Sequence, residues 1–188
     1  LSQTRAALEA RALIKAGRTR DAETLLRRVL SDDPANISAL YLLGVIQFRQ
    51  DQLAPAKRSF EQVLQAAPQH APSLNNIAVV LFRQRQYGAS LNFYDQAIAA
   101  APGQRDLLDN VAEALEAAPD DVRKGLAGQR LSRRFAEQDP TLQRDLSEKG
   151  LFRWGSTWID RAELERLQET EKQINQRLAD LDRDREIT

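Results

Sequence analysis

A gapless repeat of 34 residues constrains this chain more than any other feature of its sequence. Prolines stand at Pro34, Pro68 and Pro102, each 34 residues after the one before. Small residues keep the same step at positions 10, 44, 78 and 112 and at 22, 56 and 90, and large ones keep it at 26, 60 and 94. A fixed period of this length indicates that the first half of the chain folds as stacked copies of one supersecondary unit.

The apolar residues within each unit recur at intervals of three and four, which predicts two amphipathic helices. In the second unit, Leu40, Leu43 and Gly44 share one helical face, and Phe60 and Val63 share another. Each second helix is expected to end before the proline, which cannot continue a helix. The small residues would let the paired helices approach closely, and the large ones would fill the space beside them.

This pattern resembles the tetratricopeptide repeat, a helix-turn-helix unit of 34 residues. The resemblance covers three units, 3–36, 37–70 and 71–104, and residues 105–117 match the first helix of a fourth. Because no second helix follows in phase, we interpret 105–117 as a cap on the open end of the stack. The predicted fold class is all-α: a tetratricopeptide superhelix of three repeats plus a cap, with a helical C-terminal extension.

The resemblance implies a concave groove lined by the first helices, in which a peptide or helix of a protein partner binds. The groove positions carried over to this sequence are Arg11, Lys15, Tyr41, Val45, Phe48, Arg49, Asn75, Asn76, Val79, Phe82, Arg83 and Glu113. Aromatic residues there would anchor the partner, and Arg or Asn would bind its backbone and carboxylates. The alternatives are solvated helix ends for Lys15, Arg49 and Arg83, and a packing pair for Asn75 and Asn76.

Beyond the repeats the chain changes character. We expect a repeat domain with its cap over 1–118 and a helical extension over 119–188. The expected elements of the extension are helices at 120–137 and 140–149, a Trp-rich turn at 150–159 and a long amphipathic helix at 160–186, begun by a cap at Asp160.

The Trp-rich turn holds both tryptophans of the chain. Its aromatic residues are Phe152, Trp154 and Trp158, and Gly155-Ser156 is a turn signal. One interpretation is a plug that docks this segment on the repeats or on the next helix, since two Trp side chains bury much apolar area. The other is an exposed anchor for a partner. A stacking platform for nucleic-acid bases would need a basic groove beside it, and the sequence offers none.

The long helix carries a heptad seam that is interrupted by Glu171. The apolar residues of the seam are Leu164, Leu167, Ile174, Leu178 and Leu181. Two arrangements are open. The helix packs back along its own chain, or it pairs with another helix, which would make a homodimer through 160–186.

Charge is distributed unevenly although the chain has no net charge, with 27 basic and 27 acidic residues. Residues 1–104 carry 12 basic and 8 acidic residues, whereas 105–188 carry 15 and 19. A mildly basic stack and a mildly acidic tail make docking of tail on stack plausible, within a chain or between two, through forces that salt screens.

Nothing in the sequence nominates a catalytic, cofactor or metal site. The chain has no Cys and a single His, His70, which we expect at the surface in the loop after Pro68. Carboxylate pairs such as Asp32-Asp33 stand at helix ends, where they favour the helix dipole or a turn. Apolar stretches are too short to cross a membrane, and a neutral chain has no general attraction for nucleic acid.

Two functions are consistent with these features. The first is a non-catalytic adaptor or scaffold that holds a segment of a protein partner in its groove. The second is a self-assembly protein whose C-terminal helix docks on its own or a neighbouring stack. The high Arg content indicates a bacterial source, and the missing initiator Met and absence of Cys favour an exported protein over a cytoplasmic one.

Overall fold

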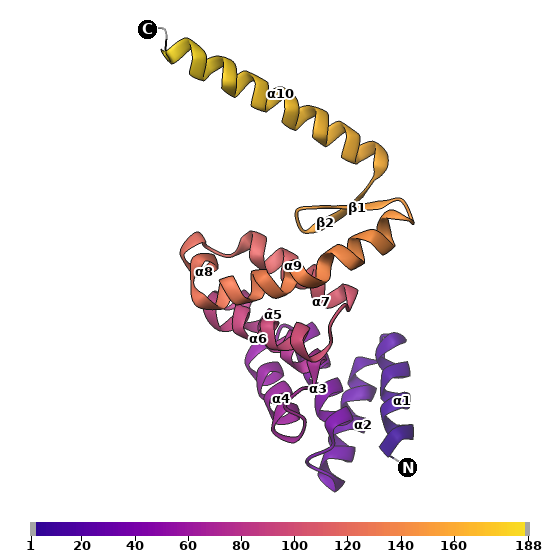
Figure 1. Cartoon of the computed structure of the whole chain (residues 1–188). Helices are drawn as coiled ribbons and strands as arrows, with labels where there is room; N and C mark the ends of the chain where they lie inside the picture. The colour runs from indigo at the N-terminus through magenta and orange to yellow at the C-terminus, as the bar shows by residue number, and fades with distance from the viewer. Residues whose placement is uncertain (1–2, 187–188) are drawn as a thin grey trace.

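The computed structural model describes residues 3–186, with side chains over 5–180 and at Arg183. Six helices form three antiparallel hairpins in its first half (Figure 1). Their bounds are α1 Gln3–Lys15, α2 Thr19–Asp32, α3 Ile37–Arg49, α4 Leu53–Ala66, α5 Ala71–Arg83 and α6 Tyr87–Ala100. The predicted all-α repeat fold, with helices at the expected 34-residue spacing, is confirmed.

The second half of the described chain is also mainly helical, with one small sheet. Its elements are α7 Arg105–Ala117, α8 Asp120–Lys124, α9 Leu126–Ser147, β1 Leu151–Trp154, β2 Thr157–Asp160 and α10 Arg161–Glu186. Helices α7 and α9 extend the stack, the strands lie beyond them, and α10 leads away from the rest of the molecule (Figure 1).

The repeat columns pack as small against large. Gly44 in α3 faces the ring of Phe60 in α4 so closely that a Cβ atom at Gly44 would lie 2.6 Å from a ring carbon. Ala10 and Ala78, in the same column as Gly44, are fully buried. Ser90 stands in the small column of the second helices and donates to the carbonyl of Ala78 at 2.8 Å. These small residues therefore allow the two helices of each pair to pack in direct contact.

Caps and turns repeat with the units. The turn after each first helix holds a residue with positive φ, at Gly17, Asp51 and Arg85. Asn36 begins α3, and its side chain accepts a hydrogen bond from the amide of Ala39. The positive-φ residue thus ends the first helix at the same phase in each of the three units, and side-chain caps begin α3 and α5.

His70 fills the N-cap position of α5, which corrects its expected place at the surface. Its Nδ1 accepts a hydrogen bond from the amide of Ser73 at 3.3 Å, and its ring lies 5.2 Å from the ring of Tyr41. The side chain is half-buried, and burial lowers the pKa of His70. The neutral imidazole is the form that can accept this bond.

The fourth unit has a second helix after all. Residues 120–137 and 140–149 were expected as two helices, but α9 runs unbroken over Leu126–Ser147 and packs on α6 and α7. Leu131 is fully buried in α9, one period after Ala97. Arg134 pairs with Asp95 of α6 at 2.8 Å. Pro140 does not break α9, because burial of Leu146 and contacts of α9 with the strands favour continuing the helix.

The predicted Trp-rich turn is a β-hairpin. Strands β1 and β2 pair antiparallel, with Arg153 opposite Trp158 and Trp154 opposite Thr157. Gly155 and Ser156 form a two-residue turn in which Gly155 alone has positive φ, as in a II′ turn. The alternation of Phe152 and Trp154 with Arg153 was therefore a true strand signal.

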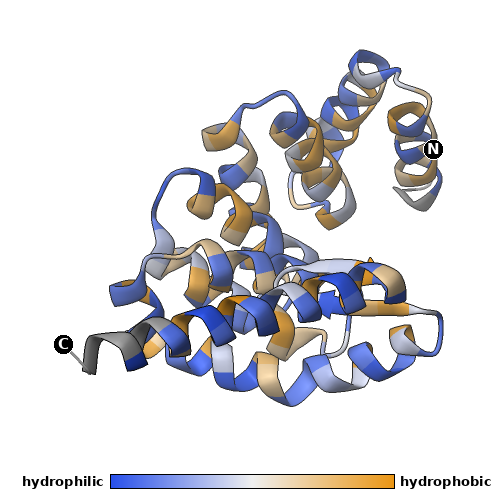
Figure 2. Ribbon diagram, turned by 90° about the horizontal axis from the view of Figure 1, so that it is seen from above, coloured by the Kyte–Doolittle hydropathy of each residue, from blue (hydrophilic) through white to orange (hydrophobic). Residues whose placement is uncertain are grey.

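Helix α10 begins directly after the hairpin, as expected. Asp160 accepts a hydrogen bond from the amide of Glu163 at 2.8 Å and so caps its first turn. Every residue from 169 to 180 is exposed, and hydrophilic residues dominate the helix (Figure 2). None of the helices over 3–186 is long and apolar enough to span a membrane.

Candidate protein-binding groove

The first helices of the four units present one face of the stack, here called the groove face. Three columns with a 34-residue step run along it: Ala7, Tyr41, Asn75 and Asp109; Arg11, Val45, Val79 and Glu113; Ile14, Phe48, Phe82 and Glu116. All three columns end on an acidic residue in the fourth unit, the second and third units are mainly apolar or aromatic, and the second column begins with the basic Arg11. The groove face therefore has a direction along which its chemistry changes.

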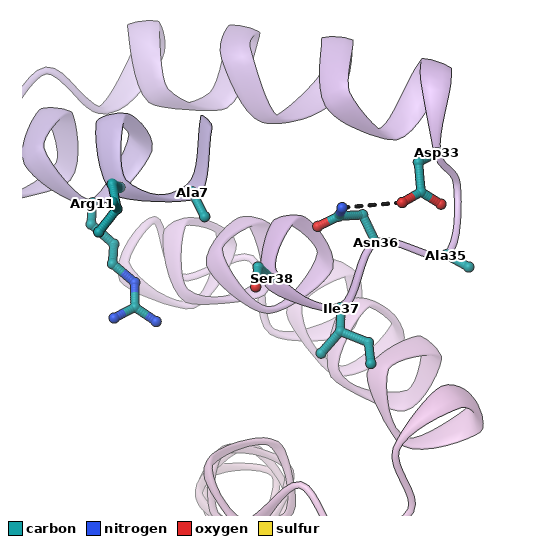
Figure 3. A pocket seen from close by; sticks show the side chains of 8 residues that line it. Ala7, Arg11, Asp33, Ala35, Asn36, Ile37 and Ser38 are labelled. Atoms are coloured by element: carbon teal, nitrogen blue, oxygen red, sulfur yellow. Dashed lines mark hydrogen bonds between the residues drawn. The ribbon is translucent and has the colours of Figure 1, made fainter. Parts of the chain in front are cut away.

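The basic end lies at the first unit. A hollow of about 480 Å³ opens there between α1 and the start of α3, lined by Ala7, Arg11, Asn36, Ile37 and their neighbours. The side chain of Arg11 extends into open space beside this hollow (Figure 3). Among the described residues, Arg11, Lys15 and Arg49 form no ion pair. Their charges are free to meet an anionic group.

The middle of the groove face is apolar. Tyr41, Val45 and Phe48 are half-buried. Val79 and Phe82 line a cavity of about 200 Å³, which Tyr94, Arg83, Asn110, Glu113 and Ala114 complete. Burial and the nearby Glu113 carboxylate raise the pKa of the Tyr94 hydroxyl, so it stays protonated. This cavity has the size and lining to take an apolar side chain.

One basic groove residue, Arg83, is engaged within the chain. Arg83 pairs with Asp51 at 2.7 Å, and its guanidinium lies 5.4 Å from the centre of the Phe48 ring. This contact links the second and third units. Arg49, at the equivalent place in the second unit, is exposed.

The amides of α5 and α7 form a short chain of hydrogen bonds. Asn110 donates to the side-chain oxygen of Asn75 at 2.9 Å, and Asn75 donates to Asn76 at 3.3 Å. The packing interpretation of Asn75 and Asn76 thus has these bonds in its favour. Each of these amides still has hydrogen-bonding capacity for a ligand backbone.

The acidic end is occupied by the chain's own hairpin. Asp109 accepts hydrogen bonds from Arg153 and from the indole of Trp158, each at 2.8 Å. Glu116 accepts a hydrogen bond from the amide of Ser156 at 2.8 Å. The hairpin therefore rests on the fourth-unit members of two groove columns. Sequence reasoning did not find this contact, because Asp109 and Arg153 are 44 residues apart and carry no shared motif.

Arg153 is the central side chain of this contact. It is 5% exposed and lies 2.9 Å from the carboxylate of Asp139, which is 3% exposed. Its guanidinium stacks 4.3 Å from the Trp158 ring centre and 5.7 Å from that of Phe135. Arg153 thus makes cation–π contacts with two rings and ion pairs with two carboxylates, and these contacts hold the hairpin against α7 and α9.

The remaining candidate residues lie apart from the groove face. Phe152 and Trp154 are half-buried on strand β1, and Arg161 stacks on the Phe152 ring at 4.9 Å. Of the predicted seam, Leu164 and Leu167 are half-buried near the hairpin, whereas Ile174 and Leu178 are exposed. The side chain of Leu181 lies outside the described residues. Within those residues, no group of three His, Cys, Asp or Glu could hold a metal ion.

The fold and this face define an all-α repeat protein built from stacked helical hairpins. Sequence models of the tetratricopeptide repeat match residues 13–76 and 49–105. The chain belongs to the tetratricopeptide repeat proteins. Comparison with curated proteins finds no match.

Solved structures of similar fold include those of MamA. A crystal structure of MamA has a TM-score of 0.62 at 15% identity, covering 76% of this chain and 81% of that one. MamA from residue 41 to its end, from Desulfovibrio magneticus RS-1, has a TM-score of 0.59 at 19% identity, covering 77% of each chain. At such identities the likeness establishes the fold alone. Tetratricopeptide repeats are generally non-catalytic modules. The repeat fold indicates a protein-interaction or scaffold role for this chain.

Proposed function

We propose that this chain is a non-catalytic scaffold whose groove face, over its first three units, binds an apolar-anchored segment of a protein partner. The observation that carries this proposal is the cavity between α5, α6 and α7. Val79, Phe82 and Tyr94 give it apolar walls, while Asn110 and Glu113 stand at its side with polar groups. An apolar pocket with a few convergent polar groups is the usual form of a recognition site.

The docked hairpin supports the proposal, because Asp109 and Glu116 of the groove columns accept hydrogen bonds from a segment that lies far away in the sequence. Because the hairpin covers Asp109 and Glu116 of the fourth unit, the ligand would lie mainly across α1, α3 and α5. Neighbouring helices pack about 8–10 Å apart, so about 20 Å separate the outer two. A helix of about 13 residues spans that distance.

Charge indicates the chemistry of the ligand. Arg11 and Lys15 stand in the first unit and Arg49 in the second, whereas Glu113 stands in the fourth. A partner segment with acidic residues at the end nearest α1 and apolar anchors further on would match this order.

A random-peptide library displayed on phage tests the proposal without knowledge of the partner. We expect selected peptides to share two apolar residues three or four positions apart, together with acidic residues. The variant with Tyr41→Ala and Phe82→Ala should lose these peptides. A second variant with Arg11→Glu and Arg49→Glu should also lose these peptides. Both positions are exposed in the native chain, so the substitutions should not disturb folding.

The matched control carries Gln62→Ala and Gln65→Ala on the exposed side of α4, with helicity followed by circular dichroism. Peptides that bind the groove variants as tightly as the native chain would show that the groove face is not the site.

Self-assembly is a second candidate function. It is favoured by the exposure of α10 over 169–180, which leaves apolar side chains without cover.

A further inference from the structure

Helix α10 carries an apolar face that no described residue of the chain covers. Ile174 and Leu178 are 52% and 55% exposed, and they stand four residues apart, on one side of the helix. Among the described residues, the other large hydrophobic side chains with such exposure are Leu8 and Leu126. Paired exposed anchors at this spacing are the pattern with which a helix enters a groove.

The start of α10 is fastened to the hairpin. Asp160 caps its first turn, Arg161 stacks on Phe152, and Leu164 and Leu167 are half-buried. From there the helix leads away from α1–α6 (Figure 1). The exposed stretch 169–180 cannot turn back onto its own groove without breaking α10 or undocking the hairpin. Docking on the chain's own stack, one of the two arrangements expected from sequence, is absent from the described part of the chain.

We infer that the exposed stretch of α10 docks in the groove of a second copy of this chain, so that copies assemble head to tail. This inference rests on the proposed function of the groove and names its occupant. Residues 169–180 span about 18 Å as a helix, close to the roughly 20 Å across α1, α3 and α5. The cavity beside Val79 and Phe82 would receive Ile174 or Leu178.

Charge favours this pairing. The stack over 1–104 has four more basic than acidic residues, whereas 169–180 carries three acidic and two basic residues. Arg11, Lys15 and Arg49 have no ion-pair partner among the described residues. With Leu178 in the cavity, Glu171 would lie about 10 Å further along the helix and would supply a partner for Arg49 of the second unit.

Pairing of α10 with α10 of another copy is less favourable. In a parallel pair the heptad seam would place two Glu171 carboxylates opposite each other in the apolar core. Leu164 and Leu167, which such a seam would also need, are already half-buried near the hairpin. About two exposed heptads then remain, too few for a stable isolated pair.

Groove-to-helix contacts use two different surfaces, so each copy can bind one neighbour at either end. Such heterologous contacts generate rings when the rotation closes and open filaments when it does not. The assembly should therefore grow with protein concentration beyond a dimer.

Complementation between two variants tests the inference, with mass followed by light scattering. The tail variant carries Ile174→Asp and Leu178→Asp, at exposed positions. The groove variant carries Val79→Glu, and a second groove variant carries Arg11→Glu and Arg49→Glu. We expect each variant alone to associate at least about tenfold more weakly than the native chain. An equimolar mixture of tail and groove variants should form a dimer and stop there, because only one intact groove and one intact helix meet.

Three results would overturn the inference: a native chain that stays monomeric at every concentration, groove variants that assemble like the native chain, or a symmetric dimer that only the tail variant loses. Binding of the phage-selected peptides distinguishes failure of the head-to-tail assembly from failure of the proposed groove function. If they still occupy the groove of a monomeric chain, the groove binds another partner; if they do not, both proposals fall.

Discussion

At the scale of single residues, close packing in the repeat columns depends on side chains that are absent or small. Gly44 is the clearest case, because its Cα faces the ring of Phe60, which is fully buried and cannot move outward. A larger residue at position 44 must push α3 and α4 apart.

We therefore expect Gly44→Val to lower the free energy of unfolding by about 1–3 kcal/mol through overpacking. Gly88→Ala is the matched control, since a Cβ atom at Gly88 meets no atom within 4 Å; it should be neutral or gain up to about 1 kcal/mol. Urea unfolding measures both. Equal effects of the two substitutions would show that the close approach at Gly44 is unimportant.

His70 should make stability depend on pH. Its pKa is lowered in the folded state by burial, so the folded state binds fewer protons than the unfolded chain as pH falls. Its contribution is fully present above the ordinary His pKa of about 6.5 and is lost as pH drops from there through the folded-state pKa. The free energy of unfolding should accordingly decrease from pH 7.5 to pH 5.

His70→Asn tests this, because Asn caps a helix but does not titrate. The variant should keep its stability better than the native chain over the same pH interval. His70→Ala should lose about 1 kcal/mol at pH 7.5 through loss of the cap. An identical pH dependence in the native chain and in His70→Asn would exclude this role for His70.

At the scale of elements, the periodic part of the sequence determined the structure and the irregular part did not. The columns through Gly44 and Phe60 repeat without gaps, so a pattern of small and large residues sufficed to predict every helical pair. Pro140 misled the prediction, because a helix break was expected where packing of α9 continues the helix. The hairpin was visible only as alternation around Arg153, and its docking on Asp109 depends on a tertiary contact that no local pattern encodes.

The candidate site was likewise predictable from the sequence only in part. The residues of the groove columns follow from the repeat period, which fixes the face of each first helix. The ion pair between Arg83 and Asp51, the amide chain from Asn110 to Asn75, and the occupation of Asp109 by the hairpin depend on how neighbouring units are set against each other. A single sequence does not give that geometry.

The hairpin should release from the stack when Arg153 is lost. Arg153→Ala leaves Asp139 buried without its cation and uncovers Trp158, which we expect to cost about 3 kcal/mol. Tryptophan fluorescence should shift to longer wavelength while far-ultraviolet circular dichroism of the repeats is kept. Arg166→Ala removes an exposed ion pair of α10 and serves as control, with an effect below about 1 kcal/mol. Unchanged fluorescence in Arg153→Ala would contradict this role of the buried arginine.

At the scale of the whole molecule, the net charge of zero is the sum of a mildly basic repeat stack over 1–104 and a mildly acidic remainder over 105–188. A basic groove end and an exposed, mildly acidic α10 lie at opposite ends of the same chain (Figure 1). If they meet between copies, association should weaken as ionic strength rises, since the exposed charges are screened beyond about 10 Å at 0.1 M salt. Sedimentation at increasing salt measures this; association that strengthens with salt would indicate a purely apolar contact.

Disulfide trapping tests most directly whether the groove receives α10. The chain has no Cys, so pairs of introduced cysteines report one contact at a time. With Val79→Cys fixed, Cys is moved singly through 169–180. We expect crosslinked ladders that peak at Ile174→Cys and Leu178→Cys and vanish at positions on the opposite side, such as Gln176→Cys. No crosslink at any position, or dimers formed by Ile174→Cys without Val79→Cys, would contradict docking of α10 in the groove.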